Sequence, residues 1–393
     1  MVYQTDDLVK VAARDNNSKR SYLYVNPLQA KHIPANPYAT MNMIGELAGK
    51  IENEYGNERL FIIGFAETAT AIAAGVAVRL ENAVYYQTTT REIQNLENEE
   101  FLYFTESHSH ATEQKLAISG YLEILNHIDR IVFVEDEVTT GNTIMKLVDQ
   151  LKIKYDMKFA IASVLNSMSD ERIKQLENEE IRCIYLNRIP FEYRIESVND
   201  LEADTEKMIE IRKNHEKRRL PYEESIDIIE MNMGIDFRTI TSVKDYRCKL
   251  DEFVNKIASG MIDQIASSKK NDNQSILMIG TEECMYPAIR LGEYFLEIRF
   301  ATNVKTHSTT RSPILVSSRE GYPLQTRYEM ASLYDSTRRT FLYNLARYDQ
   351  VWIITDAARV KHQDDFMAGL NDMIKALQMN GNDAIRVVVW KNQ

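Results

Sequence analysis

Short apolar runs alternate along the first half of the chain with stretches whose apolar residues recur at helical spacing. The runs are typical of buried parallel strands, and the spacing of three to four residues predicts amphipathic helices that cover them. The predicted strands are 21–25, 60–64, 83–90, 131–134, 159–165 and 181–186, and the predicted helices are 40–55, 71–80, 116–127, 144–151 and 169–177. Strands that alternate with helices predict an α/β domain with a mostly parallel sheet.

The residues that follow the strand at 131–134 give the most specific indication of function. Glu135 and Asp136 follow it at once, and the sequence Thr-Thr-Gly-Asn-Thr at 139–143 then leads into a helix. Adjacent carboxylates at a strand end can accept hydrogen bonds from two neighbouring ribose hydroxyls. A Thr- and Gly-rich loop at a helix N-terminus offers backbone N–H groups and hydroxyls to a phosphate. The pattern therefore favours a phosphorylated sugar, and the alternative is an acidic surface turn before a helix capped by threonine.

Residues 135–143 resemble the 5-phosphoribosyl 1-pyrophosphate (PRPP) signature of type I phosphoribosyltransferases, most closely that of the orotate enzymes. The resemblance implies that Glu135 and Asp136 are the catalytic carboxylates that hold the ribose. It implies Mg²⁺ carried by PRPP, with no direct protein ligand. Members that act on 6-oxopurines usually have an Asp in place of Thr139, and that Asp serves the base, which argues against hypoxanthine or guanine as acceptor. The residues implied to bind the 5′-phosphate, here called the phosphate loop, are Thr139, Thr140, Gly141, Asn142 and Thr143.

A second strand–loop–helix unit lies at 60–80. In the type I enzymes the loop in this position contacts pyrophosphate. Glu67 departs from that pattern, because a carboxylate repels pyrophosphate unless Mg²⁺ lies between them. The alternative is a tight turn that packs a helix on a strand. The residues assigned to the pyrophosphate side, here called the pyrophosphate loop, are Phe65, Ala66, Glu67, Thr68, Ala69 and Thr70.

Further polar residues could contact the substrate. Arg91 follows a predicted strand, and the acidic stretch at 91–104 corresponds in order to the mobile loop of the family. His108 and His110 would share one face of an extended segment, which is as consistent with a substrate contact as with a polar strand edge and is less typical of a zinc site. Lys31 and His32 lie in a proline-containing segment, where we expect them to be solvated.

The C-terminal half repeats the first in outline. Residues 275–283 echo 62–67, residues 306–311 echo 87–91, and residues 351–356 echo 132–136. The same offset separates Arg91 from Arg311 and Asp136 from Asp356, which random similarity does not favour. Because Ala357 follows Asp356 where the first copy has the phosphate loop, we expect no PRPP binding there. The pattern predicts a second, degenerate α/β domain of similar layout.

The sequence Thr-Arg-Ser-Pro at 310–313 resembles the TRSP domain. That domain follows an orotate-type phosphoribosyltransferase domain in bacterial proteins of tellurite-resistance and stress operons, which are thought to make a nucleoside-like metabolite. Arg311 could bind an anionic or nucleotide-like group, or be a structural arginine at a strand end. The predicted domains are a phosphoribosyltransferase domain at 1–190, a charged helical connector at 191–235 and a TRSP domain at 236–393.

Charge and composition argue against some classes of binding partner and cellular location. A net charge of −11 gives the chain no overall attraction to nucleic acid. The three cysteines show no disulfide or metal-binding spacing, and no apolar run has the length of a membrane span, so we expect a cytoplasmic protein.

Together these features predict an enzyme that transfers 5-phosphoribosyl from PRPP to a nitrogenous base or base-like acceptor, with Mg²⁺, as a homodimer. The alternatives are a sensor of PRPP or nucleotides without turnover, and a bifunctional chain whose second domain has its own chemistry.

Overall fold

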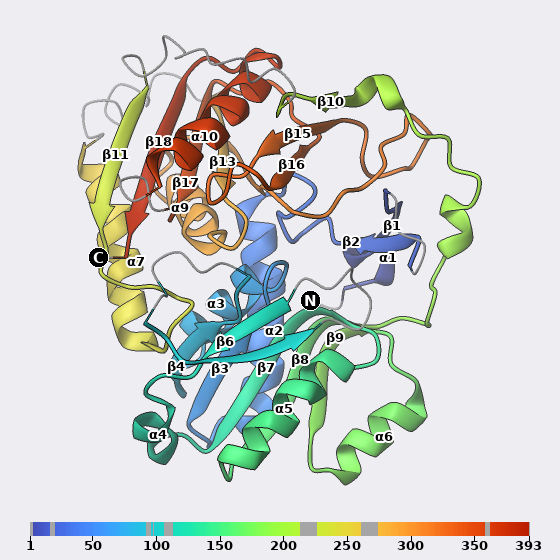
Figure 1. The fold of residues 1–393 in the computed structure, drawn as a ribbon, viewed down its shortest axis with the longest axis vertical. Helices are drawn as coiled ribbons and strands as arrows, with labels where there is room; N and C mark the ends of the chain where they lie inside the picture. The colour runs from blue at the N-terminus through green and yellow to red at the C-terminus, as the bar shows by residue number, and fades with distance from the viewer. Residues whose placement is uncertain are drawn as a thin grey trace. The chain divides into compact units, whose positions relative to one another are not determined.

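The computed structural model describes residues 3–15, 20–91, 96, 98–105, 113–212, 226–260, 274–357 and 362–392 (Figure 1). Within it the chain forms two compact units. Unit 1 consists of Met1–Leu8, Met41–Arg194 and Ile235–Lys249, and unit 2 of Val9–Thr40, Ile195–Gly234 and Leu250–Gln393. Each unit thus combines stretches that are not consecutive in the chain, whereas each domain predicted from the sequence is one continuous stretch. The limits of the predicted domains stay a prediction. No helix among the described residues is long and apolar enough to cross a membrane.

Unit 1 is built on a six-stranded sheet with the strand order β12-β4-β3-β7-β8-β9. All neighbours are parallel except β12, which pairs antiparallel with β4. The strands are β3 (Leu60–Gly64), β4 (Ala83–Thr88), β7 (Arg130–Val138), β8 (Lys158–Asn166), β9 (Arg182–Arg188) and β12 (Thr241–Ser242). The helices are α1 (Thr5–Leu8), α2 (Pro37–Tyr55), which begins in unit 2, α3 (Thr70–Arg79), α4 (Tyr121–Ile124), α5 (Asn142–Lys154) and α6 (Asp170–Asn178). Every residue of β3 is buried, as its unbroken apolar run predicts.

The predicted helix at 116–127 is wrong. Its first residues belong to β6 (Glu113–Ala117), which forms an antiparallel hairpin with β5 (Phe101–Thr105). Leu116 and Ile118 are buried in the core of unit 1, so tertiary packing decides the conformation of this apolar run. Only the short α4 and a 3₁₀ turn, Leu125–His127, remain helical, after Gly120 with φ 82°.

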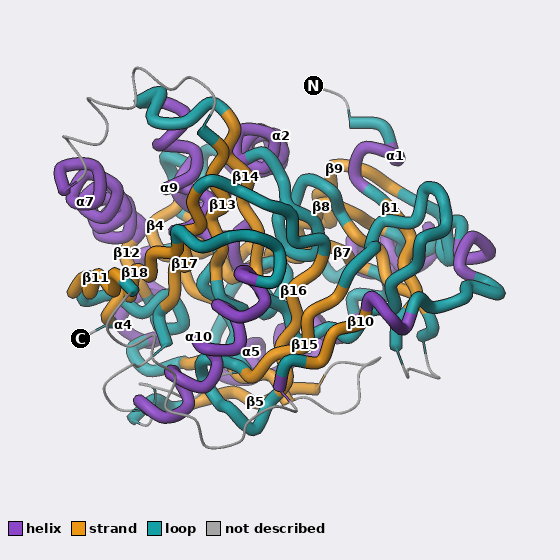
Figure 2. The backbone as a smooth tube through the Cα atoms, turned by 90° about the horizontal axis from the view of Figure 1, so that it is seen from above, coloured by secondary structure: helices purple, strands orange, loops and turns teal. Residues whose placement is uncertain are grey.

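Unit 2 is built on a five-stranded, fully parallel sheet with the strand order β11-β18-β17-β13-β14. Its strands are β11 (Asp227–Asn232), β13 (Ser275–Gly280), β14 (Asn303–Ser308), β17 (Gln350–Thr355) and β18 (Ile385–Lys391). Smaller sheets join β1 (Lys10–Ala13) with β2 (Tyr22–Val25), and β10 (Met208–Glu210) with β15 (Arg327–Ala331) and β16 (Arg339–Tyr343). The helices are α7 (Val243–Gly260), which begins in unit 1, α9 (Tyr286–Glu297) and α10 (Gln363–Gln378). α9 packs beside β13 and β14 (Figure 2).

The segment 191–235 is not the helical connector that its charge pattern predicts. Its described residues form two 3₁₀ turns, Ile195–Val198 and Thr205–Lys207, and the strands β10 and β11. β10 lies parallel to β15 and β11 lies parallel to β18, so this segment supplies edge strands to two sheets of unit 2. Edge strands have one neighbour only, which lets a charged sequence adopt this conformation.

The two main sheets share one layout, which confirms the predicted fold class. The order β4-β3-β7-β8 in unit 1 corresponds to β14-β13-β17-β18 in unit 2. In each unit an antiparallel hairpin, β5–β6 or β15–β16, precedes the third of these strands along the chain. The units differ at the next position, because unit 1 adds β9 from later in the chain and unit 2 adds β11 from earlier.

Candidate active site

The pyrophosphate loop is fixed between two strands of unit 1. Phe65 N donates to the carbonyl oxygen of Val134 on β7 at 3.1 Å, and Ala66 N donates to Thr89 Oγ1, just after β4, at 2.9 Å. The loop begins at Gly64, where a Cβ atom would lie 2.4 Å from the Cβ of Ala73 on α3. Only glycine allows this close approach of strand and helix.

A buried polar chain holds this loop in place. The Thr89 hydroxyl donates to Gln114 Oε1 at 2.7 Å, and Gln114 Nε2 donates to the carbonyl oxygen of Ala66 at 2.9 Å. Thr89 and Gln114 are almost fully buried, so these hydrogen bonds are shielded from water. Gln114 was not predicted, because its partners lie far from it in the sequence.

The acidic pair lies at the end of the same strand that the loop contacts. β7 pairs with β3 as far as Val134 and continues along β8 to Val138, so Glu135 and Asp136 extend beyond β3. Both carboxylates are half-buried, unlike the buried residues before them. Thr68 Oγ1 donates to Asp136 Oδ1 at 2.9 Å. The structure therefore brings together the acidic pair and the pyrophosphate loop, which are far apart in the sequence.

The phosphate loop turns between β7 and α5 at a glycine. Gly141 has φ 70°, a left-handed conformation in which other residues are strained, and it caps α5. The Thr140 hydroxyl accepts a hydrogen bond from Asn142 N at 3.3 Å. The loop thus lies at the N-terminus of a 13-residue helix, whose dipole favours an anion.

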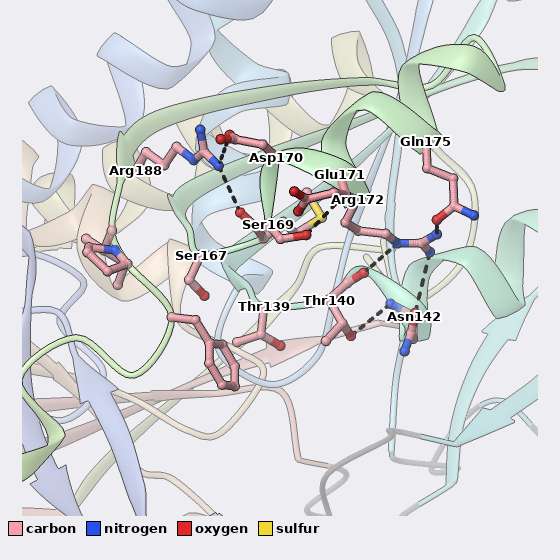
Figure 3. Close-up of a pocket in the computed structure, with 14 residues that line it drawn as sticks. Thr139, Thr140, Asn142, Ser167, Ser169, Asp170, Glu171, Arg172, Gln175 and Arg188 are labelled. Carbon is pink, nitrogen blue, oxygen red and sulfur yellow. Dashed lines mark hydrogen bonds and ion pairs between the residues drawn. The ribbon is translucent and has the colours of Figure 1, made fainter.

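An arginine from the next helix supports the phosphate loop. Arg172 on α6 donates from Nε to the carbonyl oxygen of Thr140 at 3.1 Å and from Nη2 to Asn142 Oδ1 at 3.4 Å (Figure 3). Its Nη1 donates to Gln175 Oε1 at 2.6 Å. Ser169, the N-cap of α6, accepts a hydrogen bond from Arg172 N at 3.2 Å. Sequence reasoning predicted α6 but could not show which of its side chains face the loop.

A cavity of about 1060 Å³ lies beside the phosphate loop, at the carboxyl ends of β7, β8 and β9 (Figure 3). Ser167 is 4% exposed, and its Oγ is buried with no hydrogen-bond partner among the described residues. Phe191, by contrast, is 61% exposed. The cavity combines hydroxyl groups with an exposed aromatic ring. Its lining residues are Thr139, Thr140, Asn142, Ser167, Met168, Ser169, Asp170, Glu171, Arg172, Gln175, Arg188, Ile189, Pro190 and Phe191.

Other predicted site residues have different outcomes. Arg91 is half-buried just after Thr90, whose main chain pairs with Lys115. His108 and His110 lie outside the described residues. Lys31 is not solvated as expected. It is fully buried in unit 2, where its ammonium donates to the carbonyl oxygens of Glu282 and Thr309 at 2.7 and 2.9 Å.

The described residues contain no group of three or more His, Cys, Asp or Glu side chains placed to hold a metal ion. Oxygen ligands suit Mg²⁺, and Glu135 and Asp136 could supply them only together with oxygens from a ligand such as PRPP.

Two family models match the chain. Residues 8–188 match a model described as phosphoribosyl transferase, and residues 245–376 match the TRSP domain, described as C-terminal to that transferase. The chain therefore contains a phosphoribosyl transferase domain at 8–188, and a TRSP domain follows it at 245–376. This confirms the resemblance on which the phosphate loop and the Thr-Arg-Ser-Pro sequence were interpreted. No curated protein matches the chain.

Several solved structures are similar to part of the chain. Adenine phosphoribosyl transferase from Trypanosoma brucei, solved with AMP, pyrophosphate and ribose-5-phosphate, has 13% identity over 46% of this chain and 76% of its own, with a TM-score of 0.33. Orotate phosphoribosyltransferase from Aeropyrum pernix has 15% identity over 43% of this chain and 80% of its own, with a TM-score of 0.29. The adenine enzyme from Giardia lamblia, complexed with 9-deazaadenine, has 10% identity over 47% of this chain and 95% of its own, with a TM-score of 0.34.

Proposed function

We propose that unit 1 transfers the 5-phosphoribosyl group of PRPP to a nitrogen of a small base or base-like acceptor. The bond from C1 of the ribose to pyrophosphate breaks, a bond from C1 to the acceptor nitrogen forms, and pyrophosphate leaves. The hydrogen bond from Thr68 Oγ1 to Asp136 Oδ1 carries this proposal. It links the loop assigned to pyrophosphate with the acid assigned to ribose, on either side of the bond that must break.

Positioning and charge stabilisation supply most of the catalysis in this proposal. Glu135 and Asp136 hold the ribose hydroxyls, and the phosphate loop holds the 5′-phosphate against the N-terminus of α5. An oxocarbenium-like transition state then gains from the fixed carboxylates nearby. Mg²⁺ bound with PRPP would neutralise the pyrophosphate. Glu67, 5% exposed in the pyrophosphate loop, makes such a cation necessary there.

The cavity beside the phosphate loop is the proposed place of the acceptor. Thr139 lines it, and related enzymes that act on 6-oxopurines use an Asp in that position for the base. The exposed ring of Phe191 can pack against a planar ring, and the buried Ser167 hydroxyl can hydrogen-bond to its edge. Because a TRSP domain follows, we propose that the product is a nucleoside-like metabolite of a bacterial stress response.

Titration calorimetry with PRPP and Mg²⁺ tests the donor site. We expect roughly micromolar binding to the wild type, and its loss in a Glu135→Ala/Asp136→Ala variant. The matched control is Glu81→Ala, an exposed acid before β4 at the other end of the sheet, which should bind like the wild type. No binding to the wild type would contradict the proposal.

A sensor that binds PRPP without turnover is the second candidate, because the buried Glu67 carboxylate is unfavourable for pyrophosphate. Release of pyrophosphate in the presence of a panel of bases separates the two functions. Release that depends on one base shows a transferase, whereas tight PRPP binding with no release for any base favours the sensor.

A further inference from the structure

The carboxyl end of the unit 2 sheet holds a group of charged side chains that the proposed transferase does not use. We call Glu282, Glu283, Arg311, Arg338 and Asp356 the arginine–glutamate cluster. They follow the strands β13, β14 and β17, except Arg338, which directly precedes β16. Open α/β sheets bind their ligands at the carboxyl ends of the strands, so the place itself is one where a ligand is expected.

This cluster occupies the same position in unit 2 as the candidate active site does in unit 1. Thr89 N donates to Gly64 O at 2.8 Å in unit 1, and Thr309 N donates to Gly280 O at 3.0 Å in unit 2. The Thr89 and Thr309 hydroxyls each accept a bond of 2.9 Å from the main chain of the facing loop. In that loop Glu282 corresponds to Ala66.

The following strands match in the same way. Phe65 N donates to Val134 O at 3.1 Å, and Thr281 N donates to Ile354 O at 3.2 Å. Asp136 lies two residues after Val134, as Asp356 lies two residues after Ile354. The scaffold of the site is therefore retained in unit 2, while its side chains have changed.

Two guanidinium groups converge on one carboxylate in the cluster. Arg311 Nε and Arg338 Nη1 both donate to Glu282 Oε2, at 2.8 and 2.6 Å. The other oxygen, Oε1, accepts a bond of 2.6 Å from the Ser332 hydroxyl. Charge-assisted bonds of this length are strong and hold both arginines in one geometry.

Lys31 and Asp356 make further buried hydrogen bonds at this end of the sheet. The Lys31 ammonium lies among the main-chain carbonyls of the two loops, and Asp356 Oδ1 accepts a bond of 2.5 Å from Tyr334. Lys31 therefore adds a positive charge at the main chain of Glu282, whose carboxylate both guanidinium groups contact.

The arginine side chains of the cluster are more exposed than its glutamate side chains. The side chains of Arg311 and Arg338 are 11% and 23% exposed, whereas those of Glu282 and Glu283 are 1% and 0% exposed. A ligand that approaches this end of the sheet meets arginine first. Paired guanidinium groups are suited to phosphate, because each offers several fixed donors.

Stability alone is a weak reason to keep such a cluster. Burying several charges costs desolvation energy that ion pairs only partly return, and apolar replacements are often at least as stable. Clusters of buried, interacting charges at the end of a sheet are instead common at functional sites.

We infer that the arginine–glutamate cluster is a second ligand-binding site, which takes a phosphorylated small molecule through Arg311 and Arg338. PRPP itself does not fit, because Thr355 replaces the first acid of the pair and Ala357 follows Asp356 in place of the phosphate loop. The phosphate shares the guanidinium donors with Glu282, which keeps both arginines in place when the site is empty.

The first test uses the unmodified full-length protein. Phenylglyoxal modifies accessible arginines, and mass spectrometry measures the rate at each position, with and without AMP or inorganic pyrophosphate. We expect at least one probe to slow modification of Arg311 and Arg338 by about threefold or more, since bound phosphate covers their donors. Arg339, adjacent in sequence and 58% exposed, is the internal control and should be unaffected. Equal rates with and without millimolar probe would overturn the inference.

Variants provide the second test. Calorimetry with the same probe should show binding about tenfold weaker for Arg338→Lys, which keeps the charge but loses the planar fork, and unchanged binding for Arg339→Lys. Asp136→Asn should leave the protection of Arg311 and Arg338 by the probe unchanged, so that unit 1 and unit 2 are distinguished. Equal loss of binding in both arginine variants, or loss of that protection in Asp136→Asn, would overturn the assignment to unit 2. If Arg338→Lys does not fold, the protection measured on the wild type decides.

Discussion

Arg172 Nε donates to the main-chain oxygen of Thr140 across 3.1 Å, and so ties α6 to the phosphate loop. The contact joins a helix that follows β8 to the turn that follows β7. A loop that must hold a phosphate in one geometry benefits from such support, because the cost of ordering it has been met before the ligand arrives.

We predict that Arg172→Ala weakens PRPP binding by about tenfold, because the loss of charge-assisted bonds leaves the phosphate loop less ordered. Calorimetry with PRPP and Mg²⁺ measures this change. Arg182→Ala is the matched control, since that arginine forms an exposed ion pair with Glu54 in the same unit and exposed pairs contribute little. Unchanged affinity in Arg172→Ala would show that the loop keeps its geometry without this arginine.

Phe191→Ala should raise the KM for the acceptor while leaving the affinity for PRPP unchanged, since the ring lies in the cavity assigned to the acceptor. Loss of ring packing of this kind is worth about 1 kcal/mol, or several-fold in KM. Steady-state kinetics with each substrate varied in turn measures the two effects. The control, Leu122→Ala, removes a more exposed apolar side chain outside that cavity. Equal effects on both substrates would argue against the assignment.

Gly141→Ala should destabilise unit 1 by about 1–2 kcal/mol, because a side chain is strained in the left-handed conformation at φ 70°. Urea unfolding measures the loss, and PRPP binding should weaken in parallel. Gly49→Ala is the opposite case, because Gly49 lies inside α2 and a Cβ there meets nothing within 4 Å. That substitution should stabilise the protein by up to ~1 kcal/mol. A similar change in the free energy of unfolding for both variants would contradict the strain at Gly141.

His307 predicts a loss of stability in mild acid. Its pKa is lowered from 6.5 to about 4, mainly by burial and in part by the positive charge of Lys31, although a hydrogen bond to the Tyr343 carbonyl opposes the shift. The unfolded chain therefore binds a proton between pH 6.5 and 4 that folded unit 2 does not. The contribution of His307 to the free energy of unfolding is therefore fully present above pH 6.5. It is lost as the pH falls from 6.5 to 4, by ~3 kcal/mol in total.

Urea unfolding at several pH values between 7.5 and 4 measures this dependence. His307→Gln keeps a side-chain donor and does not titrate, so its stability should fall less steeply over the same range. Identical slopes for the variant and the wild type would assign the acid sensitivity to other groups.

Central strands such as β3 and β13 could be predicted because parallel strands buried on both faces are continuously apolar. The phosphate loop and the acidic pair could be predicted because their residues are adjacent in the chain. Contacts over long sequence distances could not. The sequence predicts a solvated Lys31 because its partners, the carbonyls of Glu282 and Thr309, lie far away in the chain. For the same reason the sequence does not show that Gln114 bonds to Thr89 and Ala66.

Charge was the least reliable guide to local structure. The segment 191–235 is polar enough to predict an exposed helix, yet β10 and β11 take their conformation from strands that lie much later in the chain. Arg338 is a similar case, since only the hairpin of β15 and β16 brings it to Glu282.

The non-consecutive composition of the units has a consequence for synthesis on the ribosome. Unit 1 needs no residue beyond Lys249, whereas β18, which unit 2 places between β11 and β17, ends at Lys391. Among the early segments of unit 2, β10 must wait for β15, β11 for β18, and Lys31 for the loops of Glu282 and Thr309. The transferase fold can form early, and the waiting segments, including Lys31, are the part of the nascent chain most in need of protection by chaperones.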